Sequence, residues 1–299
     1  MSVAIVVDSA AALPPELAAD HGIIIVPLLM RVGDREYADG ELPLRDLMDV
    51  PPETVSTSGA TPAGFEAAIG EADAAGNGID GNGTDGVLIL TLAATMSATY
   101  EAARLAAADV TTPTRPVRVL DTATAAGAEG LVAIHAARAA RRGLSLDAVE
   151  AAARDAIASV RLVATVDSLD RLVASGRVSG LAARAGRLVN VNPLFEFRGG
   201  EVRSIRPAFT REAALDRIVA RWRRSRPEDA ALHVVALHAI DEDAADHLMK
   251  RVVEEVSPAT AFIGAFSSVM VANTGGGLAG LAWWWEPTGQ ASGASTGTR

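Results

Sequence analysis

The chain has 299 residues, 49% of them hydrophobic but only 4% aromatic, so its core is expected to consist mainly of Ala, Val, Leu and Ile. Its 27 basic and 37 acidic residues give a net charge of −10 at pH 7, which argues against a nucleic-acid backbone as the main partner. The absence of cysteine excludes disulfides, thiol nucleophiles and thiolate metal sites.

The first half of the chain alternates apolar runs with helical patterns, which predicts a parallel sheet with helices on both faces. The predicted strands are Val3–Val7, Ile23–Met30, Val87–Leu92 and Val117–Leu120. The predicted helices run from Pro15 to His21, near Leu44–Met48, over Ala63–Ala74, up to Ala108, and over Ala125–Arg141. A glycine-rich stretch from Gly76 to Gly86 predicts a surface loop.

The second half predicts a smaller α/β unit with a mixed sheet and helices on one side. Its predicted strands are Arg161–Val166, a hairpin over Leu194–Arg206 that turns at Gly199-Gly200, His233–His238, and two closing strands that separate near Ser267-Ser268. Its predicted helices are Leu146–Ser159, two pieces on either side of Gly176–Gly180, Arg211–Arg224 and Glu242–Val256. We therefore expect domains at residues 1–155 and 156–285, followed by a disordered tail at 286–299.

Hydroxyl and carboxyl residues lie at several junctions between these elements. They are Asp8-Ser9, Thr57-Ser58, Ser97 with Thr99, and Asp121-Thr122. Ligands of open parallel sheets bind beyond the carboxyl ends of the strands, and a helix start offers unpaired N–H groups to an anion. Each junction alone is more typical of a helix N-cap, for which Ser, Thr and Asp are the preferred residues. Together they predict a site for a carboxylate or a phosphate.

The order of these landmarks resembles that of the DegV family of fatty-acid-binding proteins. The matching segments are Asp8-Ser9 with Leu13-Pro14, Thr57-Ser58 before Pro62, Met96–Tyr100, Ser175–Ser179 and Asn273–Gly280. The resemblance extends from about Ser2 to Leu281. It implies a non-enzymatic carrier, without cofactor or metal, that holds a long-chain fatty acid between two domains. It also implies a separate fatty acid kinase subunit as the partner that phosphorylates the bound acid.

The resemblance also implies which residues bind the ligand. Thr57 and Ser97 match the carboxylate-binding hydroxyls of the family, and the predicted set is completed by Ser58, Asn273, Arg177 and Ser9. Asn273 stands where the family usually has His, so we expect a weaker electrostatic attraction to an anion. Arg177 is open to two interpretations, a contact with the headgroup or partner and a surface salt bridge. Each buried methylene of the tail would add about 0.8 kcal/mol.

The compartment is predicted from the start of the chain and its hydropathy. The N-terminus lacks the basic and apolar regions of a signal peptide, and no apolar run approaches the roughly 20 residues that span a bilayer. We therefore expect a cytoplasmic protein that makes at most transient contact with a membrane.

Three other function classes stay open. A hydrolase would combine Asp8, Ser9 or Ser97 with a histidine, although none of the five histidines lies in a recognisable nucleophile motif. Nucleotide binding would use the glycine runs, which lack the full dinucleotide and phosphate-loop fingerprints. An interaction module would use Trp283–Trp285, which we interpret as a structural element of the last strand.

A metal site is the remaining possibility. Asp241-Glu242-Asp243 is the acidic cluster that suggests it, but acidic residues are also favoured in the first turn of a helix. We interpret this cluster as a helix cap.

Overall fold

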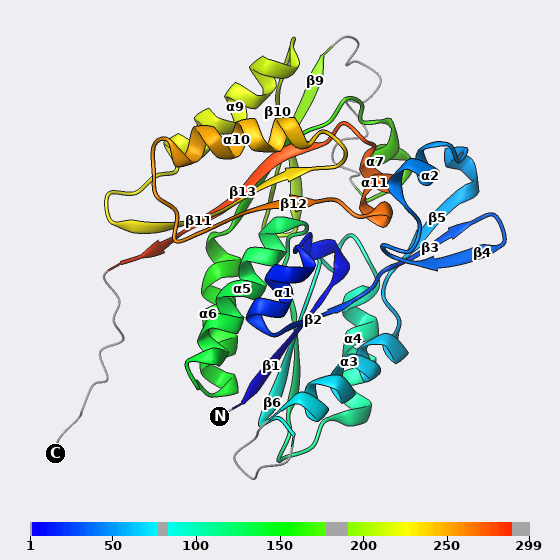
Figure 1. The fold of residues 1–299 in the computed structure, drawn as a ribbon, viewed down its shortest axis with the longest axis vertical. Coiled ribbons are helices and arrows are strands. Elements are labelled where there is room, and N and C mark those ends of the chain that lie inside the picture. The colour runs from blue at the N-terminus through cyan, green and yellow to red at the C-terminus, as the bar shows by residue number, and fades with distance from the viewer. Residues whose placement is uncertain (1, 77–82, 178–190, 289–299) are drawn as a thin grey trace.

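The computed structural model describes residues 2–76, 83–177 and 191–288. Two large sheets alternate with layers of helices along the molecule (Figure 1). Helices from the first half of the chain contact both sheets, so one apolar core continues from the first sheet to the inner face of the second. A separate core lies on the outer face of the second sheet. The predicted α/β architecture is confirmed.

The first sheet contains four parallel strands in the order β2-β1-β6-β7. They are β1 (Val3–Asp8), β2 (Ile23–Val26), β6 (Gly86–Thr91) and β7 (Val117–Asp121). Every residue of β6 is buried, as expected for a parallel strand covered on both faces. The covering helices are α1 (Pro15–His21), α5 (Gly127–Arg141) and α6 (Leu146–Ser159) on one face, with α3 (Pro62–Ala75) and α4 (Thr99–Val110) on the other.

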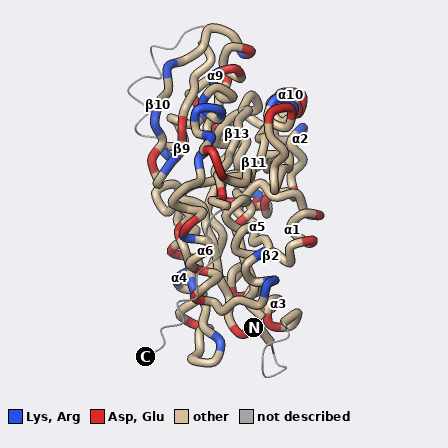
Figure 2. Tube along the Cα trace, turned by 90° about the vertical axis from the view of Figure 1, so that its left-hand side faces the viewer, with Lys and Arg blue, Asp and Glu red and all other residues tan. Residues whose placement is uncertain are grey.

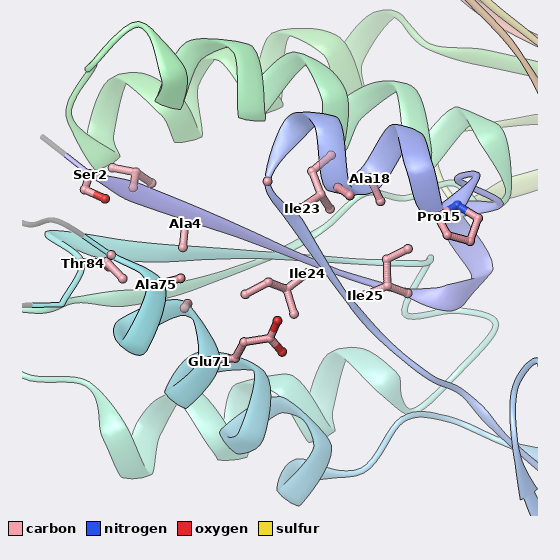
Figure 3. Close-up of a pocket in the computed structure, with 15 residues that line it drawn as sticks. Ser2, Ala4, Pro15, Ala18, Ile23, Ile24, Ile25, Glu71, Ala75 and Thr84 are labelled. Atoms are coloured by element: carbon pink, nitrogen blue, oxygen red, sulfur yellow. The ribbon is translucent and has the colours of Figure 1, made fainter.

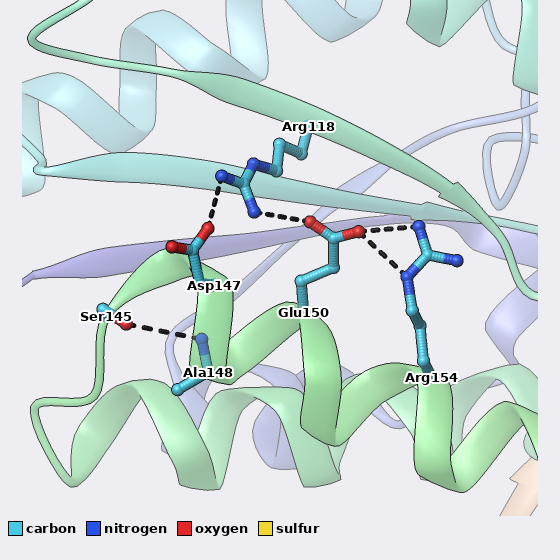
Figure 4. Close-up of polar contacts among 6 residues, drawn as sticks. All are labelled: Arg118, Ser145, Asp147, Ala148, Glu150 and Arg154. Carbon is cyan, nitrogen blue, oxygen red and sulfur yellow. Dashed lines mark hydrogen bonds and ion pairs between the residues drawn. The ribbon is translucent and has the colours of Figure 1, made fainter.

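An ion-pair network attaches α6 to the edge strand β7 (Figure 4). Arg118 of β7 places Nη2 2.5 Å from Asp147 Oδ1 and Nη1 2.7 Å from Glu150 Oε2. Arg154, one turn further along α6, binds the other oxygen of Glu150 at 2.6 Å. The hydroxyl of Ser145 caps the start of the helix. Because Arg118 bridges two acids of α6, it fixes the orientation of this helix against the sheet.

A three-stranded antiparallel sheet with the order β4-β3-β5 projects from the first half and was not predicted. Its strands are β3 (Leu29–Val32), β4 (Arg35–Ala38) and β5 (Val55–Ser58), with the short helix α2 (Leu44–Met48) between β4 and β5. The prediction of one strand over Ile23–Met30 is wrong. Pro27 has no N–H for a ladder hydrogen bond, so the chain leaves the first sheet after β2 and begins β3 elsewhere.

The second sheet contains six strands in the order β10-β9-β8-β13-β11-β12, and among its described pairs only β11 with β12 is parallel. The strands are β8 (Arg161–Thr165), β9 (Asn192–Arg198), β10 (Glu201–Ala208), β11 (Ala230–His238), β12 (Thr260–Ala265) and β13 (Ala279–Pro287). Helices α9 (Arg211–Arg224) and α10 (Glu242–Val253) cover its outer face, and α5 contacts its inner face. The predicted mixed sheet and hairpin are confirmed.

Two predictions near the C-terminus are corrected. Between the two closing strands lies an unpredicted helix, α11 (Ser268–Thr274). Disorder from Glu286 is wrong for the first residues of the predicted tail, because β13 continues to Pro287 and Glu286 Oε2 lies 3.0 Å from His233 Nε2. Residues 289–299 lie outside the described residues, as does the helical piece expected after Gly180. The helical piece before Gly176 is α7 (Asp170–Ala174).

The tryptophan run of β13 is structural, as interpreted from the sequence. Trp283 lies in the outer core, whereas Trp284 lies in the core shared with α5. The alternation follows from the two-residue period of a strand. The indole N–H groups of Trp283 and Trp285 both donate to Ser225 Oγ, at 2.8 and 3.1 Å.

The acidic cluster is likewise structural: Asp241 Oδ1 accepts from Ala244 N at 3.1 Å and caps α10. Basic and acidic positions are interspersed along the trace in the view of Figure 2. Within the described ranges, no helix combines the length and apolar character needed to cross a membrane. The first sheet ends before α6 and the second begins with β8, while the exact domain boundary at residue 155 stays a prediction.

Candidate functional site

A small pocket of about 60 Å³ lies where the two halves of the chain meet. Five of the six predicted binding residues line it: Thr57, Ser58, Ser97, Arg177 and Asn273. They come from the end of β5, the turn before α4, the segment after α7, and α11. Thr57 and Asn273 are 216 residues apart in sequence, and their side chains are nevertheless within hydrogen-bond distance.

Arg177 is at the centre of the polar contacts. Its Nη2 donates to Thr57 Oγ1 at 3.0 Å and its Nη1 to Asn273 Oδ1 at 2.9 Å. Its Nε donates to the carbonyl of Met96 at 3.1 Å, which links it to the turn that carries Ser97. Asn273 Nδ2 also donates to Thr57 Oγ1, at 3.3 Å. One guanidinium therefore holds together three segments of the pocket.

The charge of Arg177 has no described counter-charge. All the acceptors above are neutral, and no ion pair joins Arg177 to a carboxylate within residues 2–76, 83–177 and 191–288. Partial burial lowers the pKa of its guanidinium, because a charge is less stable away from water. Arginine keeps its proton in proteins all the same. The pocket therefore presents a positive charge that a small anion can neutralise.

Ser97 adds a hydroxyl at the start of α4. Its Oγ accepts from Thr99 N at 3.2 Å and lies 2.7 Å from Thr99 Oγ1. Thr99 is fully buried, and its Oγ1 also accepts from Ala60 N at 3.3 Å. When Thr99 donates its hydroxyl hydrogen to Ser97, the hydrogen of Ser97 is free to bind a ligand. A Cβ at Gly59 would lie 2.7 Å from Thr99 Oγ1, so this junction requires glycine.

Ser9 lies outside the residues that line the pocket. Its hydroxyl donates to Asp39 Oδ2 at 2.6 Å and accepts from Leu28 N at 3.0 Å. Asp39 also accepts from the hydroxyls of Ser267 and Ser268 and from Val269 N, which caps the start of α11. Ser9 is therefore linked through Asp39 to the start of α11, the helix that carries Asn273, and supports the position of this helix.

Asp39 and the apolar lining were missed by sequence reasoning. Asp39 lies in a turn after β4, and nothing in its local sequence indicates contacts with residues more than 220 positions away. The apolar lining consists of Leu28, Leu92, Met96, Ala125, Leu172, Val269 and Met270. These side chains come from both halves of the chain. Ligand pockets typically measure about 300–1,000 Å³, so a long apolar ligand requires these side chains to separate.

The geometry does not support the alternative chemistries. None of the five histidines lines the pocket, and both oxygens of Asp8 are occupied by backbone N–H groups. The described residues contain no group of three or more His, Cys, Asp or Glu placed to hold a metal ion. The site therefore has a cationic group and an apolar wall, but no described nucleophile paired with a base.

A wider hollow of about 590 Å³ lies beside β2, between α1 and α3 (Figure 3). Ile24, Ile25 and Ala75 line it, with Glu71 as its charged side chain. Its charge is therefore opposite to that of the first pocket. None of the predicted binding residues contributes to this hollow.

The chain is similar to a large set of known proteins. A sequence model described as "Uncharacterised protein, DegV family" matches residues 2–286. A DegV domain-containing protein of Streptomyces coelicolor is 34% identical over 285 residues, covering 93% of this chain and 97% of the relative. A "fatty acid-binding protein" of Thermotoga maritima is 25% identical over 283 residues, covering 94% and 97%.

A solved structure extends the likeness to three dimensions. It is described as fatty acid binding of a DegV family protein from Thermus thermophilus, and it matches with a TM-score of 0.85 and 26% identity. The match covers 95% of this chain and all of the other. The Thermus thermophilus protein therefore shares the fold described above.

Proposed function

The chain belongs to the DegV family, and from that premise we propose that it binds a long-chain fatty acid between its two halves. The carboxylate lies against Arg177, Thr57, Ser97 and Asn273, and Ser58 contacts it from the rim. The tail extends into the apolar lining. Fatty-acid binding is stated for the Thermotoga maritima relative and the Thermus thermophilus structure, which supports the same ligand class here.

One observation carries the proposal: the guanidinium of Arg177 has neutral partners from both halves of the chain. An incoming carboxylate would supply the missing negative charge and form charge-assisted hydrogen bonds, which are about twice as strong as neutral ones. The free hydroxyl hydrogen of Ser97 supplies another donor. Asn273, in place of the family's His, contributes an amide, so the positive charge of this site comes from Arg177.

The apolar lining determines the energetics of the tail. A pocket of about 60 Å³ is too small to hold a long acyl tail. Binding must therefore separate the side chains of Leu92, Met96 and Met270. Methionine side chains change rotamer readily, which suits a wall that opens. Each methylene that enters gains about 0.8 kcal/mol, so a long tail can offset the separation of these side chains.

The proposed role is that of a carrier without a catalytic step of its own. In this role the two halves act as the domains predicted at residues 1–155 and 156–285, and the ligand lies between them. The acid would be presented to a separate fatty acid kinase subunit that forms the acyl phosphate.

The experiment is native mass spectrometry of the purified protein, with identification of any molecule released on denaturation. A co-purifying acyl chain, or uptake of an added long-chain fatty acid at one per chain, is the expected result. Ser97→Ala should weaken that binding by about 1–3 kcal/mol, because a charged headgroup loses a donor. Ser56→Ala is the matched control, since Ser56 lies on the same strand as Thr57 and does not line the pocket. A protein that neither carries nor takes up fatty acids would refute the proposal.

A further inference from the structure

Two carboxyl groups, those of Asp8 and Glu129, lie fully buried beside the pocket, and we call them the acid pair. Asp8 ends β1 and Glu129 lies in the first turn of α5. Each residue is 0% exposed. Asp8 Oδ1 accepts from Ala10 N at 3.0 Å and its Oδ2 accepts from Leu92 N at 2.8 Å. Among the described residues, neither oxygen of Glu129 has a hydrogen-bond donor while both groups are ionised.

Buried hydroxyls next to the acid pair are also without partners. Thr91 and Thr124 are 0% and 2% exposed, and their Oγ1 atoms have no hydrogen bond within the described part of the chain. Val7 is paired with Leu90, and Thr91 with Asp121, so Asp8, Thr91 and Asp121 occupy neighbouring positions across three parallel strands. Neighbours in register point to the same face of a sheet. These three side chains therefore lie together at the carboxyl ends of their strands, beside the segment after β1 that α5 contacts.

No described cation balances the acid pair. The other charged groups that face it are acids, Asp39 toward Asp8 and Asp121 toward Glu129. Burial first, and then these like charges, raise the pKa of Asp8 to about 7 and that of Glu129 well above its ordinary range. Two ionised carboxylates can only accept hydrogen bonds and repel each other. A proton on Glu129 converts it into a donor to Asp8, which removes both problems.

We propose that the acid pair is a proton-binding site, in which one proton shared by Asp8 and Glu129 holds the pocket wall in its fatty-acid-binding form. This inference rests on the proposed function. Leu92 is attached to the pair through its N–H, and its side chain lines the pocket. Ala125, another lining residue, lies at the entry to the helix that carries Glu129. Loss of the proton separates the carboxylates and shifts both parts of the wall.

The backbone next to Ala125 makes this part of the wall sensitive to such a shift. Ala123 and Ala126 have φ of 50° and 55°, in a region that residues with a side chain rarely adopt. Strained conformations of this kind persist only where surrounding contacts hold them. Deprotonation also adds a negative charge close to an anionic ligand. Both effects weaken fatty-acid binding as the pH rises.

The first test needs neither ligand nor variant. Carbon-13 NMR of the ligand-free full chain, labelled at Asp and Glu carboxyls, should show two carboxyls that ionise well above the ordinary range of Asp and Glu, with Asp8 ionising near pH 7. Titration of all carboxyls below about pH 5, as in ordinary Asp and Glu, would overturn the proton site.

The second test links the site to the ligand. Affinity for a fluorescent long-chain fatty acid is measured at pH 6 and pH 9, where the free headgroup is ionised. The wild type should bind about tenfold more weakly at pH 9, a coupling of ordinary size, and Glu129→Gln should change by less than about threefold. Glu66→Gln, at an exposed position of α3, is the control and should follow the wild type.

Asp8→Asn is the second variant, with the same expected loss of pH dependence. Equal losses in the wild type and both acid-pair variants would overturn the link between proton and pocket. Absence of fatty-acid binding at every pH would refute the proposed function and the link with it. The carboxyl titration would still decide the proton site by itself.

Discussion

Arg177 and the acid pair of Asp8 and Glu129 are both ionisable groups without a described counter-ion. They differ in how their charge can be neutralised. Arg177 is half-buried at the junction of the two halves and donates to Thr57, Asn273 and a carbonyl. The acid pair is fully buried in the first half. Arginine cannot become neutral near physiological pH, whereas a carboxyl can. The same lack of a counter-ion therefore underlies both proposals, an anion site in one region and a proton site in the other.

The largest expected effect comes from removing the cation. Arg177→Gln should weaken fatty-acid binding by about 2–4 kcal/mol, because the carboxylate then lies in a partly buried pocket without a charge partner. Binding is measured by titration with a fluorescent fatty acid. Arg104→Gln is the control, since Arg104 pairs with Glu101 on the exposed face of α4. A loss below about threefold would place the carboxylate elsewhere.

A second variant gives Arg177 a negatively charged partner within the protein. Asn273 Oδ1 is already 2.9 Å from Arg177 Nη1, so Asn273→Asp places a carboxylate there with little change in shape. Affinity should fall by about 1–3 kcal/mol, because the new internal ion pair competes with the ligand. Thermal stability should stay equal or rise. Full affinity in this variant would contradict an anion site centred on Arg177.

Sequence reasoning predicted both sheets and most of the polar residues that line the pocket because their signals are local. The buried run of β6 and the hydroxyls around Ser97 each occur within a few residues, and their order carried the resemblance to the DegV family. The small sheet was missed because its strands are four residues long and its pairing depends on the break at Pro27.

The charge arrangement was not predictable in the same way. Whether Arg177 makes a salt bridge depends on which acids the fold brings near it, and the nearby partners proved neutral. Glu129 lies in the first turn of a helix, where acids are common, so nothing in its local sequence marks it, and the other polar groups near it are brought together by the register of three strands. Ser9 was predicted with the ligand set, yet the contacts with Asp39 that give it a supporting position come from long-range packing.

The third prediction sharpens the acid-pair half of the comparison through stability. The folded chain binds the Asp8 proton more tightly than the unfolded chain, since the pKa rises from 3.8 to about 7 on folding. Wild-type stability should therefore decrease as the pH rises from about 4 to about 7. Glu129→Gln supplies an amide donor that needs no bound proton, so it should be more stable than the wild type by about 1–2 kcal/mol at pH 8.

At pH 5 the proton is still bound, and the same substitution should change stability little. Urea unfolding at the two pH values measures the difference. An equal gain in the free energy of unfolding at pH 5 and pH 8 would mean that the stability gained by Glu129→Gln does not depend on proton binding.

The smallest expected effect is at the rim of the pocket. Ser58 lines the pocket but is exposed, so water can replace its hydrogen bond to a ligand. Ser58→Ala should therefore change fatty-acid affinity by no more than about 0.5 kcal/mol, well below the effect of Ser97→Ala in the same titration. If the two substitutions weaken binding equally, the carboxylate lies nearer the rim than Arg177 would hold it. The charge of Arg177 would then act on the carboxylate from a longer distance. Arg177 would differ from the acid pair in the distance to the charge that it acts on, as well as in the sign of its own charge.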